Sequence, residues 1–391
     1  MRYVRFLAAI SMLIALAAML GCNSEESSIT SPPPGPRTIS VDFANPLEIC
    51  VDSDRHRALL LHGRTSSRGT ALQLVDLQSH TVINTRILDF NDVFDAEFLP
   101  GDKACLVVRT QDRMEYAVQF LTLPDLALGA RVMTADTAGT HGYLAVDGQA
   151  GYVYYSHAGG GDKDGLFKIS LGTQALVDAD SDDNTRAAFD NDLVTDLFER
   201  PGRIYFDGPS QKLMVANLDA DYITQIDAGI WGTLRRADHL SLPLPGVTQM
   251  NTLTGGLNAV RAEAMAAAGE GRLVFAGTSD GRAFLSRIQV TSTVPWEPVT
   301  MPSYRRWAFR NADLLVHPRE DMQWLFILQR DSTRFSIGRY NVSSLSLGDD
   351  FKYLTRAIPD TSISAVGLDT ELDLLIVGDA HLPRLELIEI E

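Results

Sequence analysis

The chain of 391 residues carries 34 basic and 50 acidic side chains, which gives a net charge of −16 at pH 7. A surface with this excess of negative charge repels phosphate backbones, so nucleic acid is excluded as an expected partner. It also disfavours adsorption of the folded body to anionic lipid. The apolar content of 45% is ordinary for a globular protein, so the chain can bury a sizeable core.

The first 22 residues form a segment distinct from the rest of the chain. Arg2 and Arg5 precede an apolar run of about 15 residues, shorter than the roughly 20 needed to span a bilayer. The run ends in Met19-Leu20-Gly21-Cys22. This end resembles the signal of bacterial lipoproteins, and the resemblance implies that Cys22 is acylated, with palmitate, and becomes the mature N-terminus. The alternative is an ordinary secretory signal with a chance cysteine.

Residues 23–36 are rich in serine, proline and glutamate and have almost nothing to bury, so they predict a disordered tether. Acyl chains on Cys22 would hold the protein at a membrane without a transmembrane helix. Asn23 follows the cysteine, which by resemblance to enterobacterial sorting implies the outer membrane of the bacterial cell envelope. Without Arg2 and Arg5, 32 basic side chains remain against 50 acidic ones, a net charge of −18.

From residue 37 to residue 391 one pattern of short apolar runs returns. Its first copy, residues 48–88, has four runs separated by polar or glycine-rich turns, which is typical of four antiparallel strands. The second run of each copy is the most apolar and marks the repeat. These markers are residues 58–61, 104–108, 151–155, 212–216, 272–276, 323–328 and 373–377. Seven four-stranded sheets predict an all-β domain, a seven-bladed β-propeller.

The last copy stops after its third strand, at residues 384–391, whereas residues 37–43 form an apolar run without a partner. We expect this N-terminal strand to complete the C-terminal blade, because closure of the ring removes two exposed sheet edges. The pattern resembles the broad group of seven-bladed propellers that includes the YVTN, quinoprotein-like and WD40-like repeats. The Trp-Asp dipeptides of WD40 repeats themselves are absent.

Strand direction assigns the connections to two faces. First-to-second and third-to-fourth turns lie on one face of a blade, and second-to-third and blade-to-blade connections lie on the other, which we name the loop face. The long segments fall in the second set, and they are residues 157–164, 178–201, 242–257 and 301–312. Long loops on a rigid scaffold usually carry binding, so we expect the working surface there.

One of these segments joins aromatic and basic side chains on an otherwise acidic protein. Arginine and tryptophan anchor protein interfaces, and arginine grips carboxylates through a planar fork. The segment therefore predicts a contact with a protein or peptide partner. The alternative is a loop that packs its aromatics on the next blade and pairs its arginines with the acidic surface. The residues concerned are Tyr304, Arg305, Arg306, Trp307 and Arg310.

First strands line the central channel of a propeller, and each contributes a polar side chain near the loop face. A ligand at the channel mouth is one interpretation of this set, and ordered water is the other. The set is chemically mixed, so it does not resemble the repeated metal ligands of lactonase-type propellers. Its members are Glu48, Asp95, His141, Arg203, Glu263 and Asp313.

An acidic stretch places carboxylates at alternate positions, at Asp178, Asp180 and Asp182, as the first part of an EF-hand loop does. However, Asp183 stands where glycine is needed, and Phe189 stands where a bidentate glutamate is needed. A looser Ca²⁺ site is the one cofactor this sequence suggests. The alternative is a solvated acidic insert.

Catalytic signatures are lacking. The eight histidines have no metal-binding spacing, no nucleophile elbow or phosphate loop occurs, and the glycines of residues 159–161 read as a flexible loop. Cys50 and Cys105 sit in apolar strands, so buried thiols are expected, with a disulfide as the alternative. The sequence favours a monomeric, non-enzymatic binding or scaffold module for an envelope protein or peptide. The alternative is an enzyme, or a carbohydrate- or small-ligand-binding protein, acting at the channel mouth.

Overall fold

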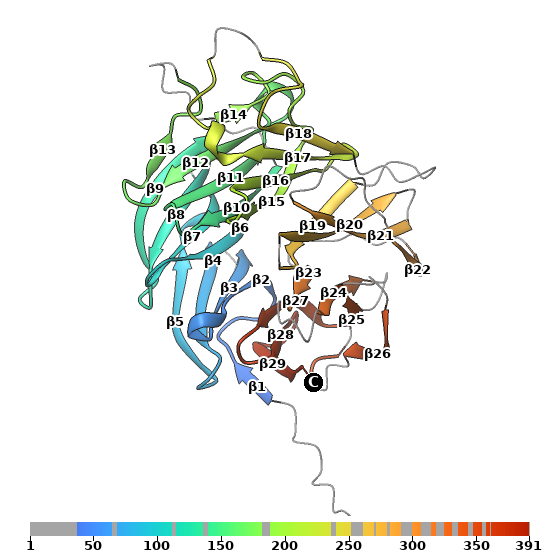
Figure 1. The fold of residues 1–391 in the computed structure, drawn as a ribbon. Helices are drawn as coiled ribbons and strands as arrows, with labels where there is room; N and C mark the ends of the chain where they lie inside the picture. Colours follow the sequence, from blue (N-terminus) through green and yellow to red (C-terminus); the bar gives the residue numbers. More distant parts are fainter. Residues whose placement is uncertain are drawn as a thin grey trace, which may run out of the picture. The chain divides into compact units, whose positions relative to one another are not determined.

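The computed structural model describes residues 37–390 except 65–68, 112–114, 136–139, 182–187, 236–239, 252–260, 270, 280–281, 291–298, 306–313, 318–323, 331–334, 343–346, 354–356 and 360. Seven antiparallel sheets follow one another along the chain and form a ring, so the predicted seven-bladed β-propeller is confirmed (Figure 1). The strands are hydrogen-bonded in sequence order, except that β14 pairs with β12 in blade 3 and that β1 pairs with β29 in blade 7. No helix in the described part of the chain is sufficiently long and apolar to cross a membrane.

Blades 1 to 3 occupy the first half of the chain. Blade 1 contains β2 (Pro46–Asp52), β3 (Arg57–Arg64), β4 (Thr70–Asp76) and β5 (Thr81–Leu88). Blade 2 contains β6 (Phe90–Leu99), β7 (Lys103–Thr110), β8 (Tyr116–Thr122) and β9 (Ala127–Ala135). Blade 3 contains β10 (Thr140–Asp147), β11 (Tyr152–Ala158), β12 (Gly165–Ser170), β13 (Ala175–Val177) and β14 (Ala188–Asp190).

Blades 4 to 7 follow the same plan. Blade 4 contains β15 (Pro201–Asp207), β16 (Lys212–Asn217), β17 (Tyr222–Asp227) and β18 (Val247–Asn251), and blade 5 contains β19 (Arg261–Ala267), β20 (Arg272–Ser279), β21 (Arg282–Gln289) and β22 (Val299–Arg305). Blade 6 contains β23 (Leu314–Val316), β24 (Trp324–Arg330), β25 (Phe335–Asn341) and β26 (Leu347–Tyr353), and blade 7 contains β27 (Ile363–Asp369), β28 (Leu374–Asp379), β29 (Arg384–Glu389) and β1 (Arg37–Ser40). Three short 3₁₀ helices are η1 (Ser53–Arg55), η2 (Gly161–Lys163) and η3 (Ala228–Ile230).

The core is divided among the seven junctions between neighbouring blades, and each junction holds one cluster of buried apolar side chains. Strand β3 shows how one strand serves two junctions. Leu59 and Leu61 pack in the cluster shared with blade 2, whereas Ala58 and Leu60 pack in the cluster shared with blade 7. Because successive side chains of a strand point to opposite faces, burial on both faces requires an unbroken apolar run. This requirement explains why the second strands mark the repeat in the sequence.

The ring closes as predicted. Strand β1 pairs with β29, so the last sheet has the order β1-β29-β28-β27 and contains both ends of the described chain (Figure 1). The Val41 N–H donates to the carbonyl of Pro383 at 3.0 Å. Ile39 packs in the cluster between blades 7 and 1. Apolar burial and backbone pairing therefore hold the N-terminal strand against blade 7.

The prediction that nearly all long connections lie on the loop face is wrong at blades 3 and 4. Strands β13 and β14 pair with the two ends of β12, so part of the acidic segment interrupts the outer strand of blade 3. Residues 247–251, predicted as part of a blade-to-blade loop, form the outer strand β18. The long connection of blade 4 therefore precedes β18, and it belongs to the third-to-fourth set on the opposite face.

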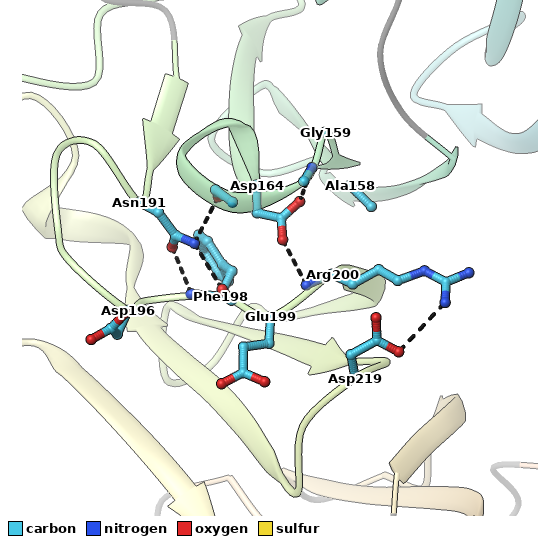
Figure 2. A pocket seen from close by; sticks show the side chains of 11 residues that line it. Ala158, Gly159, Asp164, Asn191, Asp196, Phe198, Glu199, Arg200 and Asp219 are labelled. Atoms are coloured by element: carbon cyan, nitrogen blue, oxygen red, sulfur yellow. Dashed lines mark hydrogen bonds and ion pairs between the residues drawn. The ribbon is translucent and has the colours of Figure 1, made fainter.

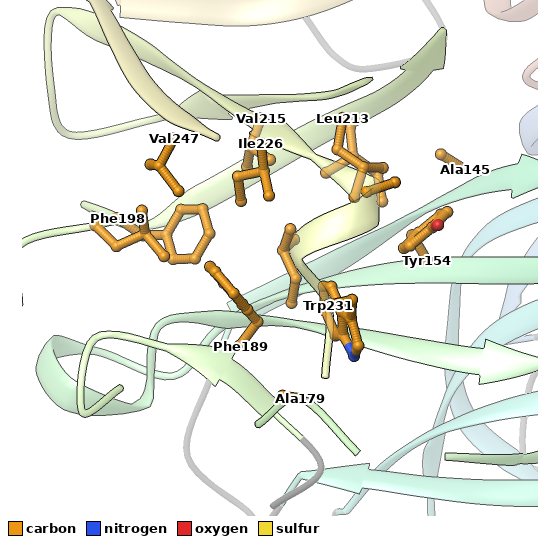
Figure 3. Packing of buried hydrophobic residues seen from close by; sticks show 14 of the residues in the cluster. Ala145, Tyr154, Ala179, Phe189, Phe198, Leu213, Val215, Ile226, Trp231 and Val247 are labelled. Carbon is orange, nitrogen blue, oxygen red and sulfur yellow. The ribbon is translucent and has the colours of Figure 1, made fainter. Parts of the chain in front are cut away.

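These two additions meet and enlarge the core between blades 3 and 4. The Gly232 N–H donates to the Ala179 carbonyl at 3.0 Å, and the Ser181 N–H donates to the Leu234 carbonyl at 2.7 Å. Phe189 stacks on Trp231 with ring centroids 5.2 Å apart (Figure 3). Because the additions bring their own apolar side chains, this junction is a rigid base for the connections above it.

Candidate functional site

The first strands, which line the channel, have irregular register. In six blades the first strand carries a register shift against its neighbour near its start, and a bulge of this kind re-aims a side chain. Blade 6 has no such shift within its described residues. The shifts fall between Pro46 and Glu48, Val93 and Asp95, Thr140 and Gly142, Pro201 and Ile204, Ala262 and Ala264, and Ile363 and Val366.

Arg203 is the centre of a buried polar cluster in the channel. Its Nη1 lies 3.2 Å from Oδ1 of Asp95, and its Nη2 lies 3.9 Å from Oε1 of Glu48. The backbone N–H of Leu144 donates to Oδ2 of Asp95 at 2.6 Å. The guanidinium also lies 5.4 Å from the ring centroid of Tyr143. Strands from blades 1, 2, 3 and 4 thus meet at one side chain, so three of the six predicted channel residues come together.

Negative charge exceeds positive charge in this cluster, because Glu97 of β6 is a third carboxyl beside a single arginine. Burial, and then the charge of Asp95, raises the pKa of Glu97 to about 8. The same two causes raise the pKa of Glu48 well above its ordinary value. Burial alone would lower the pKa of Arg203, but the surrounding carboxylates raise it. Burial and mutual repulsion therefore both favour the protonated form of a carboxyl in this cluster.

Of the other three predicted channel residues, the structure describes the side chain of Glu263 alone. Glu263 is half-buried on β19, at the register shift of that strand. His141 lies on β10 at the shift of blade 3, and its side chain is outside the described residues. Asp313 is also outside them. A channel-mouth ligand stays a prediction for these three.

The two cysteines are free thiols that belong to different cores. Cys50 packs against the cluster between blades 1 and 2, whereas Cys105 lies in the cluster between blades 2 and 3. Burial, and then the charge of Glu97, raises the pKa of both thiols well above the ordinary value. The expectation of a buried thiol is confirmed for Cys105, whereas Cys50 is half-buried.

A pocket of about 610 Å³ opens on the loop face above the junction of blades 3 and 4 (Figure 2). Its walls are the second-to-third connection of blade 3, the connection between the two blades and the second-to-third connection of blade 4. All three belong to the set assigned to that face. The lining residues are Ala158, Gly159, Gly160, Gly161, Asp164, Asn191, Asp196, Phe198, Glu199, Arg200 and Asp219.

Two polar side chains fasten the walls of this pocket. Asp164 is buried, and its two carboxylate oxygens accept the backbone N–H groups of Gly160 and Arg200, each at 2.7 Å. The Asn191 side chain donates to the carbonyls of Gly161 and Phe198 and accepts the Phe198 N–H at 2.8 Å. Figure 2 shows these bonds joining one connection to the next. The pocket is therefore preorganised by side chains that are already satisfied.

The glycines at residues 159–161, which the sequence predicts to be a flexible loop, line the pocket. Gly160 and Gly161 have φ values of 85° and 62°, in the left-handed region that favours glycine. A Cβ on Gly159 would lie 2.6 Å from the Lys163 Cβ and 2.8 Å from the Lys163 carbonyl oxygen. Only glycine allows the chain to turn this tightly into η2.

The remaining sequence predictions lie elsewhere. Tyr304 and Arg305 end the outer strand β22 rather than beginning a loop, and Arg306, Trp307 and Arg310 are outside the described residues. Asp178 is half-buried and Asp180 is buried beside the interruption of the outer strand, and Asp182 is outside the described residues. Among the residues that the structure describes, no group of three or more His, Cys, Asp or Glu is arranged to hold a metal ion.

Sequence reasoning missed Glu97 and the pocket carboxylates. Glu97 could have been found, because it follows Asp95 by two positions and so faces the same side of β6. Asp196, Glu199 and Asp219 come from different connections, and nothing in their spacing announces that they share one pocket.

Fold and site together define a seven-bladed β-propeller with a loop-face pocket and a buried arginine–carboxylate cluster among the inner strands of blades 1 to 4. No protein-family model and no curated protein matches the chain.

Proposed function

We propose that the protein is a binding or scaffold module of the bacterial cell envelope that engages a protein or peptide through its loop face. One observation carries the proposal: three connections from two blades build a fastened pocket of about 610 Å³ on that face. A volume of this size falls in the range of about 300–1,000 Å³ that is typical of ligand pockets. A disc with a shaped pocket on one face suits the recognition of a partner.

Photo-crosslinking in the native envelope tests which face binds. A crosslinking amino acid replaces Thr195, which is exposed between β14 and β15 on the loop face, or Gln149, which is exposed in the turn between β10 and β11 on the opposite face. We expect a discrete crosslinked protein from position 195 and none from position 149. Equal crosslinking from both positions, or none from either, would refute the proposal.

The aromatic-basic segment offers a second part of the same surface. Arg305 ends β22, and the chain leaves a fourth strand toward the loop face. On this proposal Arg305→Glu and Trp307→Ala abolish capture of the partner from envelope extracts. Unchanged capture would leave the segment with a structural role.

The anchor is the remaining element of the proposal. The proposal assigns to Cys22 the acyl chains, including palmitate, that hold the protein at the outer membrane, and to residues 23–36 the tether. A Cys22→Ser variant is then expected in the soluble fraction of broken cells and takes up no alkyne-palmitate label. A Cys22→Ser protein that stays membrane-bound would refute the proposed lipid anchor, and it would leave the proposed binding face unaffected.

The buried cluster around Arg203 favours a second candidate, a small-ligand or carbohydrate site at the channel mouth. Carboxyls with raised pKa values in a cleft are common at functional sites. Saturable binding of a sugar or quinone that raises the melting temperature, and that Glu263→Gln or His141→Ala removes, would support it.

A further inference from the structure

The pocket on the loop face carries more negative charge than its own arginine can balance. Four of its lining residues are acidic, and they are Asp164, Asp196, Glu199 and Asp219. Arg200 is the single basic residue in the lining. Its Nη1 lies 3.5 Å from Oδ1 of Asp219, in an exposed pair. Asp164 is occupied by two backbone N–H groups.

Asp196 and Glu199 are therefore the carboxylates left over. Both are exposed, and within the described chain no basic side chain pairs with either carboxylate. Their backbone groups are already used: Gln249 donates to the Asp196 carbonyl at 2.7 Å, and the Glu199 N–H donates to Asn217 Oδ1 at 2.9 Å. The backbone thus fixes where the two carboxylates stand, and the carboxylates remain available.

The pKa of the nearby Tyr222 phenol depends on the charges of these two carboxylates. Burial raises its pKa first, and the charges of Glu199 and Asp196 raise it further. Both carboxylates therefore lie near the same side chain.

A bare metal ion does not fit this arrangement. Among the described residues no three carboxyl, imidazole or thiol groups converge as a metal requires. The pocket of about 610 Å³ instead has room for a long side chain with a cationic end, and its exposed carboxylates supply the opposite charge. Lysine and arginine combine an apolar stem with a charged head.

We propose that this pocket receives a lysine or arginine side chain of the partner protein, with Asp196 and Glu199 as its counter-charges. The inference rests on the proposed function of the loop face and adds the chemistry of the partner. The net charge of −16 favours a basic partner at long range, which assists the encounter.

Fluorescence anisotropy on the full-length protein tests the inference with a labelled hexapeptide of alternating glycine and arginine, and with its glutamate counterpart. We expect saturable binding of the arginine peptide and none of the glutamate peptide. Addition of 0.5 M NaCl should weaken the binding, because it shortens the Debye length to about 4 Å. The double variant Asp196→Asn/Glu199→Gln should weaken binding about tenfold. Asp196 has φ of 58°, which asparagine tolerates, so the backbone is retained.

The matched control carries the same two charge changes on the opposite face. Asp125→Asn/Glu371→Gln alters exposed carboxylates in turns of the opposite set, and binding should change less than about twofold. Equal weakening by both double variants would reduce the effect to general attraction and overturn the inference. Stabilisation by CaCl₂ that the pocket variant loses would also overturn it, in favour of a metal.

Crosslinking from position 195 separates this inference from the function on which it rests. If the pocket variant still crosslinks its envelope partner as strongly as the unchanged protein, the loop face binds but the basic side chain is refuted. If neither protein crosslinks, the proposed function itself fails.

Discussion

Around Arg203 three carboxyls surround one guanidinium inside the channel, whereas around Arg200 three of the four pocket carboxylates are exposed. The Arg203 side chain is 13% exposed and Asp95 is 1% exposed. The Arg200 and Asp219 side chains are 43% and 49% exposed. Similar residue types therefore differ in their setting: the first group joins four blades, and the second leaves negative charge exposed on the loop face.

The same substitution at the two arginines should separate the two regions most strongly. Arg203→Met leaves Asp95 buried without its counter-charge, and we expect a loss of about 3–5 kcal/mol in the free energy of unfolding. Arg200→Met breaks only an exposed pair and should cost less than about 1 kcal/mol. Urea denaturation followed by circular dichroism measures both. Similar small losses for the two variants would show that the channel cluster does not hold the ring.

Asp164 tests whether the pocket has a rigid frame beneath its exposed charges. Asp164→Ala removes the acceptor of two backbone N–H groups and should cost about 2–3 kcal/mol. Amide hydrogen exchange should accelerate at Gly160 and Arg200. Glu199→Ala is the control, because its carboxylate fastens no backbone group among the described contacts, and exchange at those amides should stay unchanged. Unaltered exchange in Asp164→Ala would contradict the fastening role.

Glu97 gives the channel cluster a dependence on pH. Its pKa is about 8 in the folded protein against an ordinary value of 4.5, so the folded state binds the proton more tightly. Stability is therefore greatest below pH 4.5 for this group and falls as pH rises to about 8. Glu97→Gln should remove a fall on the order of 2 kcal/mol, measured as urea midpoints between pH 5 and pH 9. An unchanged pH profile would place the titrating proton elsewhere.

The smallest effect belongs to the carboxylates proposed to bind. Asp196→Asn/Glu199→Gln should change the free energy of unfolding by no more than about 0.5 kcal/mol, because neither carboxylate pairs with a basic side chain in the described part of the chain. Thermal unfolding gives the measurement. A loss above about 1 kcal/mol would make these residues part of the frame and would weaken the contrast with the channel.

The ring was predictable from sequence because burial on two faces leaves an unbroken apolar run. Ala58 to Leu61 serve two cores at once, and no amphipathic strand would show such a run. The unpaired strand at the N-terminus was predictable because the last repeat lacked a fourth strand. The sequence did not indicate that the acidic segment splits an outer strand, since short pieces such as β13 and β14 have three residues each.

The candidate site was predictable only in part. The alternation of side chains along the first strands predicted that Glu48, Asp95 and Arg203 face the channel. The register shift between Val93 and Asp95, however, could not be predicted from the amino-acid composition of the strand. The pocket depends on where three connections cross, and that is set by long-range packing at the junction of blades 3 and 4. Asp164 gives no clue of its role, because an aspartate after a glycine run looks like any turn residue.

The pairing of β1 with β29 also governs when the protein can become stable. A chain delivered from its N-terminus presents β1 first, and its partner arrives after every other described strand. Until then the junction between blades 7 and 1 stays open, and the largest loop closure in the molecule is still to be made. An interrupted chain therefore leaves the edges of blade 7 unpaired, whereas the pairing of β29 with β1 completes that sheet.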